Sequence, residues 1–169
     1  LVIVADYQTD GRGQRDKKWH SANNKNLLFS IYIKPNNFNV TQKKYFNMIT
    51  SVSIIYTLKN YIKNSKIEIK SPNDILVDGC KISGILIETK IFKKKINRVI
   101  IGVGININQK KFPFKENKPT SINKILKFTI DKNEFLSLFL ENFSLLFNFF
   151  KEKNYKFLSK EYLSFLKES

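Results

Sequence analysis

Residues 67–107 read IEIKSPNDILVDGCKISGILIETKIFKKKINRVIIGVGINI, and this segment carries most of the predicted sheet. Four short segments within it are rich in isoleucine and valine, a composition that predicts consecutive strands: Ile67–Lys70, Asp74–Val77, Ile82–Ile91 and Arg98–Ile107. Asp78-Gly79 is a strong hairpin signal between the second strand and the third. Neighbouring strands joined by tight turns pair antiparallel, so we expect a largely antiparallel sheet.

On the N-terminal side of this stretch, the sequence predicts two more strands and one long helix. Leu1–Ala5 and Leu27–Ile33 are apolar strand-like runs, and the polar segment Asp6–Lys25 between them reads as a long loop. From Thr41 to Ile62 the apolar residues recur at helical spacing.

On the C-terminal side, helices dominate. Pro119–Leu126 is a short connector with some helical character. Asp131 and Glu134 form a start resembling a capping box for a strongly apolar helix that continues through Phe150. A last helix is expected over about Asn154–Leu166.

This order of elements predicts an α+β fold of one domain, with a mixed, largely antiparallel sheet and helices mainly on one face. It is not an alternating βαβ chain, and the sequence has neither a Walker A segment nor a strand-linked GxGxxG. The chain begins without methionine inside a strand-like run and ends just after a helix, so we expect a fragment of a longer protein.

Composition removes many kinds of chemistry. A single cysteine, Cys80, cannot form an internal disulfide or build a zinc site alone. A single histidine, His20, removes histidine-dependent triads and multi-histidine metal sites. No apolar run reaches the roughly 18–20 residues of a membrane span, and no secretory signal is visible, so we expect a cytoplasmic protein.

The net charge of +16 ordinarily suggests nucleic acid, but its composition weakens that interpretation. Only Arg12, Arg15 and Arg98 are arginine, and the other 27 basic residues are lysine. Lysine, isoleucine and asparagine all have A/T-rich codons, and together they supply 68 of the 169 residues. We therefore attribute the charge to biased composition and expect no specific DNA binding.

The loop segment Gln8–Trp19 is the first candidate for chemistry. Its glycines would let a backbone approach a ligand closely, and its arginines would supply planar forks for phosphate or carboxylate. The only tryptophan ends the segment, where it could cover a flat ring. On composition alone, a solvated basic loop remains an alternative.

Two further segments are candidates. The first is the pair of segments Lys70–Asp74 and Lys81–Leu86, in which Lys81 is at the start of a predicted strand. The side chain of Lys81 either extends along apolar surface or faces a negative charge that develops during a reaction. In Gly102–Asn108, glycines at alternate positions leave two bare spots on one face of a strand, which admit a ligand or a closely packed neighbour.

In this order and spacing, the segments resemble the biotin protein ligase family. The matching stretches cover nearly the whole chain: Ala5–Trp19, Lys25–Ser30, Lys70–Ile75, Lys81–Leu86, Gly102–Asn106 and the turn at Pro119–Ile122. The combination of GRG with basic residues, KxPND and GxGIN is specific, although each motif alone is weak. The resemblance implies that residues 1–169 form one catalytic domain, with the fold of biotin ligases and class II aminoacyl-tRNA synthetases.

The resemblance also implies an activity in two steps. The carboxylate of biotin attacks the α-phosphate of ATP to give biotinyl-5′-AMP and pyrophosphate. A lysine amine of a biotin carboxyl carrier protein, such as the acetyl-CoA carboxylase subunit, then takes the biotinyl group. Magnesium is expected with ATP, its protein ligands are unknown, and a homodimer is possible.

Site residues carry over from the family by position. Lys81 and Arg12 are the expected catalytic residues. The expected biotin-binding residues are Gln8, Gly11, Arg12, Gly13, Gln14, Lys81, Gly84, Gly102 and Gly104. The expected ATP- and adenylate-binding residues are Arg15, Trp19, Lys70, Asn73 and Asn106. Asp74 is a candidate magnesium ligand, but we favour a turn residue that hydrogen-bonds its own backbone.

The sequence departs from the family at several positions. Ser71 replaces the usual tryptophan of KWPND, Gln14 and Asp16 replace a frequent arginine and glycine, and Asn24 replaces a glycine while tolerating a left-handed backbone. We also expect this chain to lack the family's N-terminal Ser-Thr-Asn segment, its C-terminal SH3-like domain and any DNA-binding helix-turn-helix. Three alternatives stay open: a lipoate or octanoate ligase of the same fold, an inactive ligase remnant, and a basic nucleic-acid-binding domain.

Overall fold

The computed structural model describes residues 1–14, 17–35, 37–113 and 118–168. Its elements follow one another along the chain as β1 (Val2–Ala5), β2 (Leu27–Ile33), β3 (Phe38–Asn39), the 3-10 turn η1 (Val40–Gln42), α1 (Lys43–Tyr61), β4 (Ile67–Lys70), β5 (Asp74–Val77), β6 (Cys80–Phe92), β7 (Lys95–Ile105), α2 (Ile122–Leu126), α3 (Lys132–Lys151) and α4 (Tyr155–Ser164).

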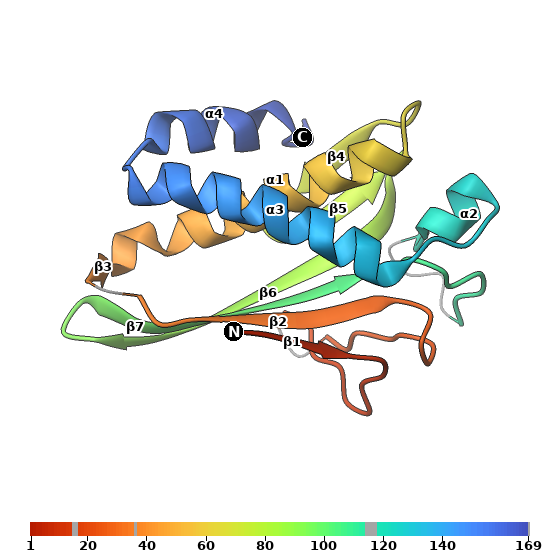
Figure 1. Cartoon of the computed structure of the whole chain (residues 1–169), viewed down its shortest axis with the longest axis horizontal. Helices are drawn as coiled ribbons and strands as arrows, with labels where there is room; N and C mark the ends of the chain where they lie inside the picture. Colours follow the sequence, from red (N-terminus) through yellow and green to blue (C-terminus); the bar gives the residue numbers. More distant parts are fainter. Residues whose placement is uncertain (15–16, 36, 114–117, 169) are drawn as a thin grey trace.

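The strands form one sheet in the order β1-β2-β7-β6-β5-β4, and the short strand β3 pairs with the start of β7. Each of these strand pairs is antiparallel. The helices α1, α3 and α4 lie on one side of the sheet, whereas the loop between β1 and β2 runs along the other side (Figure 1). The predicted α+β architecture, with helices mainly on one face, is confirmed.

Strand β7 shows how the two faces of the sheet differ. Side chains alternate between the faces of a strand. Val99, Ile101, Val103 and Ile105 are almost completely buried and belong to the hydrophobic core. The residues between them include Gly102 and Gly104, which point to the face without helices. One face of β7 therefore fills the core, and the other is left nearly bare.

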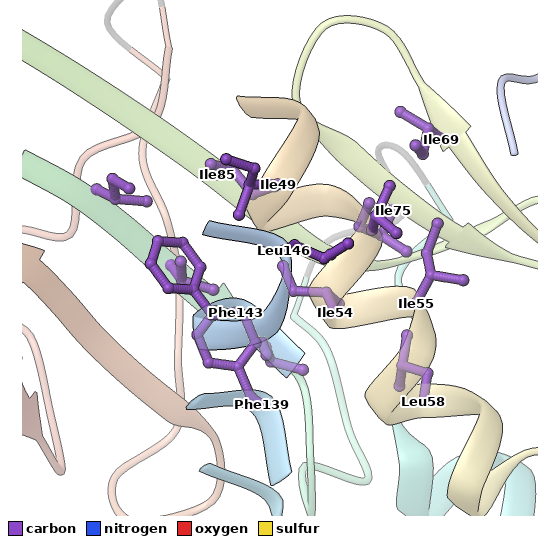
Figure 2. Close-up of a cluster of buried hydrophobic side chains, with 14 of the residues drawn as sticks. Ile49, Ile54, Ile55, Leu58, Ile69, Ile75, Ile85, Phe139, Phe143 and Leu146 are labelled. Atoms are coloured by element: carbon purple, nitrogen blue, oxygen red, sulfur yellow. The ribbon is translucent and has the colours of Figure 1, made fainter. Parts of the chain in front are cut away.

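Helix α3 supplies the aromatic part of the core. Asp131 caps its N-terminus, because its side chain accepts a hydrogen bond from the backbone N–H of Asn133 at 2.7 Å. The buried residues that follow recur every three or four positions and so lie along one stripe: Phe135, Phe139, Phe143, Leu146 and Phe150. Figure 2 shows Phe139, Phe143 and Leu146 beside the apolar side chains of α1.

Helix α1 is buried between the sheet and the other helices, so apolar residues are not confined to one side of it. Ile49, Ile54, Ile55 and Leu58 are each 0% exposed, although they point in several directions around the helix. Three of its buried hydroxyl groups are satisfied within the helix, since Thr50, Ser53 and Thr57 each donate to the carbonyl four residues earlier.

The predicted boundaries agree closely with the structure for β2, β4 and β5, and the helices expected near residues 41–62, 131–150 and 154–166 are confirmed. Two differences concern strands. The two-residue strand β3 was not predicted, and β6 and β7 extend further toward each other than expected. Lys93 and Lys94 form the turn between them with positive φ angles of 45° and 61°, at positions where glycine or asparagine would have signalled a hairpin.

No helix among the described residues is both long enough and apolar enough to cross a bilayer.

We predict that Phe139→Ala lowers the free energy of unfolding by about 3–5 kcal/mol, because it opens a cavity in the core. Phe139 is 0% exposed and lies 5.0 Å from Phe29 between ring centroids. The matched control is Phe128→Ala, since Phe128 is 59% exposed and its removal should change stability by no more than about 0.5 kcal/mol. Urea denaturation measures both; equal losses in the two variants would contradict this description of the core.

Candidate active site

A cavity of about 670 Å³ lies on the helix-free face of the sheet, within the size range of small-molecule sites. The loop between β1 and β2, the turn between β4 and β5, and strands β2, β6 and β7 form its walls. Most of the residues predicted from sequence line it: Gln8, Arg12, Gly13, Gln14, Trp19, Lys70, Asn73, Lys81, Gly84, Gly102 and Gly104. The structure thus brings together residues that lie nearly a hundred positions apart.

Three predicted residues stand differently. Gly11 lines two smaller neighbouring cavities instead of the main one. Asn106 is buried and does not line the main cavity; its side-chain amide donates to the carbonyl of Thr120 at 2.9 Å, which ties the end of β7 to the segment before α2. Arg15, like the family departure at Asp16, lies outside the described residues.

The glycines of the loop allow it to fold back on itself. The backbone N–H of Trp19 donates to the carbonyl of Gly11 at 2.8 Å, and that of Gly13 donates to Lys17 at 2.6 Å. A Cβ atom at Gly11 would lie only 2.4 Å from the carbonyl oxygen of Trp19, so a larger residue cannot fit there. We predicted that these glycines would serve ligand approach; in the structure they first serve the close contact between the two arms of the loop.

The folded loop places the indole ring of Trp19 against the glycines of the sheet. Gly84 on β6 is paired directly with Gly104 on β7. A Cβ atom at Gly104 would lie 2.4 Å from Cε2 of Trp19, and one at Gly84 would lie 3.1 Å from its Cζ3. The predicted bare spots at Gly102 and Gly104 are therefore present, and Trp19 occupies the one at Gly104 together with the adjacent Gly84. Gly102 meets only ordinary contacts with Leu86 and leaves its part of the cavity floor open.

Lys81 lies beside this ring and is held in place by a carboxylate. Its Nζ atom is 2.7 Å from Oδ1 of Asp74 and 5.6 Å from the centroid of the Trp19 ring. Both partners of the ion pair are largely shielded, with side-chain exposures of 21% for Lys81 and 17% for Asp74. The turn interpretation of Asp74 is wrong: Asp74 is the first residue of β5, and its side chain holds Lys81.

The remaining cations around the cavity are exposed. Arg12 is 4.0 Å from Glu88, a pair in which both side chains are at least half exposed. Lys18 pairs with Asp10 at 3.4 Å. Lys17 and Lys70 have no carboxylate within 4.0 Å among the described residues. The lining therefore carries more positive than negative charge, which favours an anionic ligand.

The turn between β4 and β5 is fixed from both sides. Asn47 of α1 donates to the carbonyl of Pro72 at 2.6 Å, and Asn73 donates from its side chain to Ile85 of β6 at 3.0 Å. Ser71, which stands where the family has tryptophan, hydrogen-bonds Tyr162 of α4. Burial raises the pKa of Tyr162, and the bond to Ser71 partly offsets this shift.

The cavity also has lining residues that the sequence analysis did not single out, including Ser30, Leu86, Glu88 and Ile100. They belong to the rows of the sheet that contain Gly102 and its neighbours: Ser30 and Leu86 are both paired with Gly102, and Glu88 is paired with Ile100. The strand register identifies these four residues as lining residues. The register could be assigned only after the pairing of β2, β6 and β7 was known.

No three histidine, cysteine, aspartate or glutamate side chains come together to hold a metal ion in the described part of the chain. Asp74, the candidate magnesium ligand of the sequence analysis, forms an ion pair with Lys81.

Comparison with known proteins places this geometry in a family. The model of the Biotin/lipoate A/B protein ligase family matches residues 1–106, which include β1 to β7 and most of the cavity lining. Among curated proteins, the Bifunctional ligase/repressor BirA of Bacillus subtilis (strain 168) is 33% identical over 108 residues, covering 64% of this chain and 33% of that protein. Biotin--protein ligase 2 of Arabidopsis thaliana is 27% identical over 172 residues, covering 95% and 49%.

Solved structures agree over the whole chain. The biotin protein ligase from Aquifex aeolicus in complex with biotin and ATP has a TM-score of 0.82 at 30% identity, covering 98% of this chain and 68% of that one. The biotin protein ligase from Leishmania major shares the fold, with a TM-score of 0.80 at 19% identity over 99% and 71%.

This chain spans about a third to a half of the length of these curated relatives. Since the family model covers well over half of the chain and the structural match extends through α4, the chain belongs to the Biotin/lipoate A/B protein ligase family.

Proposed function

We propose that residues 1–169 are the catalytic core of a biotin–protein ligase. In this proposal the chain activates biotin as biotinyl-5′-AMP and then transfers the biotinyl group to a lysine of a biotin carboxyl carrier protein, such as that of acetyl-CoA carboxylase. One observation carries the proposal: the shielded side chain of Lys81 lines a cavity that is bounded by the backbone of the sheet at Gly102 and by the indole ring of Trp19. The 30% identity to a ligase solved with biotin and ATP supports it.

The first step suits the groups that are present. A biotin carboxylate oxygen bonds to the α-phosphorus of ATP, the bond to the bridging oxygen breaks, and pyrophosphate leaves. The attacking carboxylate is already ionised near pH 7, so this step needs no histidine or cysteine base. Its difficulty is the approach of an anion to a polyanion, and a fixed ammonium group at Lys81 lowers that barrier by compensating the charge.

The second step uses the same position. The amine nitrogen of the carrier lysine bonds to the carbonyl carbon of the mixed anhydride, AMP leaves with the electrons of the broken C–O bond, and the amine gives up a proton. Lys81 beside the phosphate stabilises the departing AMP. Asp74 maintains Lys81 in this place by the 2.7 Å ion pair.

The other residues divide between the two substrates. Gln8, Gly13 and Gln14 of the loop, with Gly84, Gly102 and Gly104 of the sheet, are assigned to biotin from the family resemblance, and all of them line the cavity. Arg12 is assigned to the phosphate or carboxylate, and Trp19, Lys70 and Asn73 to the adenylate. Asn106 retains only an indirect role in this proposal, because it supports the segment before α2. Magnesium would enter as the MgATP complex, and the proposal retains the cytoplasmic location expected from the sequence.

The family also includes lipoate ligases, so the identity of the acid is the first point to test. We expect biotinyl-5′-AMP, detected by mass spectrometry, when the chain is mixed with biotin, ATP and magnesium. Lipoate in a parallel reaction should give no lipoyl adenylate. Adenylate from lipoate alone would replace biotin with lipoate as the substrate. No adenylate from either acid, with a folded chain, would contradict the proposed activity of this core.

Lys81→Ala should reduce the rate of adenylate formation by about 10²–10³-fold, the usual effect of removing one fixed group that stabilises transition-state charge. The matched control is Lys63→Ala, because Lys63 is exposed beyond the C-terminal end of α1 and away from the cavity. Pyrophosphate-exchange assays measure both variants. Equal rates in Lys81→Ala and Lys63→Ala would remove Lys81 from the mechanism.

Arg12→Ala should speed the release of the adenylate by about ten- to a hundredfold, since one charge-assisted hydrogen bond is worth about 1.5–3 kcal/mol. Arg98→Ala is the control, because Arg98 is exposed and does not line the cavity. Rapid filtration of the labelled adenylate gives both release rates. If Arg12→Ala releases the adenylate as slowly as Arg98→Ala does, Arg12 has no part in retaining it.

A further inference from the structure

Two buried carboxamides lie beneath the loop and have no place in the mechanism so far. Asn26 immediately precedes β2 and is 0% exposed, and Gln109 lies four residues beyond the end of β7 and is 4% exposed. Neither lines the main cavity. Buried amides require hydrogen-bond partners, and the partners of these two residues indicate what they do.

The hydrogen bonds of Asn26 fix its orientation. Its Oδ1 accepts from the backbone N–H of Ile107 at 3.1 Å, so its amino group points toward the loop. That group donates to Oε1 of Gln109 at 2.6 Å and to Oγ of Ser21 at 3.0 Å. Each polar atom of the Asn26 side chain is therefore engaged.

Gln109 connects the same point to two segments of the chain. Its Oε1 also accepts from the backbone N–H of Ala22 at 3.0 Å, which fastens the C-terminal end of the loop. The side-chain amino group of Gln109 donates to the backbone carbonyl of Lys111 at 2.9 Å. The backbone carbonyl of Gln109 accepts from the hydroxyl of Ser121 at 2.6 Å. The oxygen at the end of one side chain thus joins the loop after β1 to the segment after β7.

The position of this pair relative to Trp19 gives it a function. Trp19 precedes Ala22 by only three residues, so fixing Ala22 limits where the indole can lie. Trp19, Ser21, Ala22, Gln109 and Lys111 all line a second cavity of about 340 Å³, adjacent to the main one. Trp19 lines both cavities and therefore stands at their boundary.

We propose that Asn26 and Gln109 are positioning residues that hold Trp19 against Gly84 and Gly104 and couple the loop to the segment after β7. They act through Ser21 and Ala22 and do not touch the reacting groups. Without the acceptor at Gln109, the N–H of Ala22 and the amino group of Asn26 lose their shared partner, and the loop end is released. The indole then leaves its place over the glycines more readily.

The first test does not depend on any enzymatic activity. Trp19 is the only tryptophan, so fluorescence excited at wavelengths that tyrosine does not absorb reports on the surroundings of Trp19 alone. Gln109→Met keeps the length of the side chain and removes its hydrogen bonds. We expect a larger acrylamide quenching constant and a red-shifted emission in the folded variant.

The matched control is Gln42→Met. Gln42 also makes two side-chain hydrogen bonds, to Tyr155 and to the backbone of Asn39, both at 2.7 Å, but it lies in η1 and lines neither cavity. Its emission and quenching should match those of the unchanged chain. Identical quenching in Gln109→Met and Gln42→Met, with native circular dichroism in both, would overturn the proposal.

Ser21→Ala keeps the proposal testable if Gln109→Met does not fold, because Ser21 is partly exposed and its hydroxyl makes only two hydrogen bonds, from Asn26 and to the carbonyl of Ala22. It should increase quenching in the same direction but to a smaller extent. Quenching equal to that of the unchanged chain would overturn the proposal in that case.

The second test rests on the proposed function. Loosening Trp19 should release the adenylate about tenfold faster in Gln109→Met, which corresponds to about 1.4 kcal/mol of lost retention. Gln42→Met should retain it normally. If the unchanged chain forms no adenylate, the proposed function fails while the fluorescence test still stands. If it does form adenylate and Gln109→Met releases it at the normal rate, the positioning role fails.

Discussion

Strands β6 and β7 pair in a register that puts Gly84 directly opposite Gly104, and the rest of the site depends on this pairing. The opposite face of both strands is filled by the core under α1 and α3, so only the bare face can receive a ligand. Because two adjacent residues lack a Cβ atom, the indole of Trp19 can approach the backbone of the sheet. The loop that carries Trp19 then has a fixed surface on which to fold, and it closes one side of the cavity. Any side chain at Gly104 would remove this surface, because its Cβ atom would overlap the ring.

The fold was largely predictable because its elements follow local rules. Segments rich in isoleucine and valine and the Asp78-Gly79 turn predicted the central strands, and the cap at Asp131 predicted the start of α3. The errors occurred where tertiary contacts override local preference. The strand β3 is only two residues long and exists because it pairs with Ile96 and Lys95 of β7. The turn at Lys93-Lys94 adopts a left-handed backbone with no glycine or asparagine, so no local signal marked it.

The candidate site was predictable in its membership but not in its contacts. The resemblance to the biotin protein ligase family, carried over position by position, selected eleven of the residues that line the cavity. It could not show that Trp19 fills the space above the glycines, since that depends on how the loop folds over the sheet. The role of Asp74 was mistaken for the same reason: its partner Lys81 lies seven residues away, across a hairpin. Asn106 illustrates the converse, because a residue inside a matching motif serves the adjoining backbone instead of lining the cavity.

The ion pairs of the site differ in exposure, and this difference separates two roles. The pair of Lys81 with Asp74 is close and shielded, so solvent and salt screen it weakly and Lys81 keeps its position before any substrate arrives. The pair of Arg12 with Glu88 is long and exposed, with 72% of the Arg12 side chain accessible, and such pairs contribute little stability. Arg12 can therefore exchange Glu88 for an anionic ligand at small cost. In the proposed function, the fixed cation of Lys81 would stabilise charge during the reaction, whereas the loosely held cation of Arg12 would close with its loop around a bound phosphate. The thirty basic residues of the chain are thus not equivalent. Lys81 and Arg12 differ in the length and the exposure of the ion pair that each forms with a carboxylate.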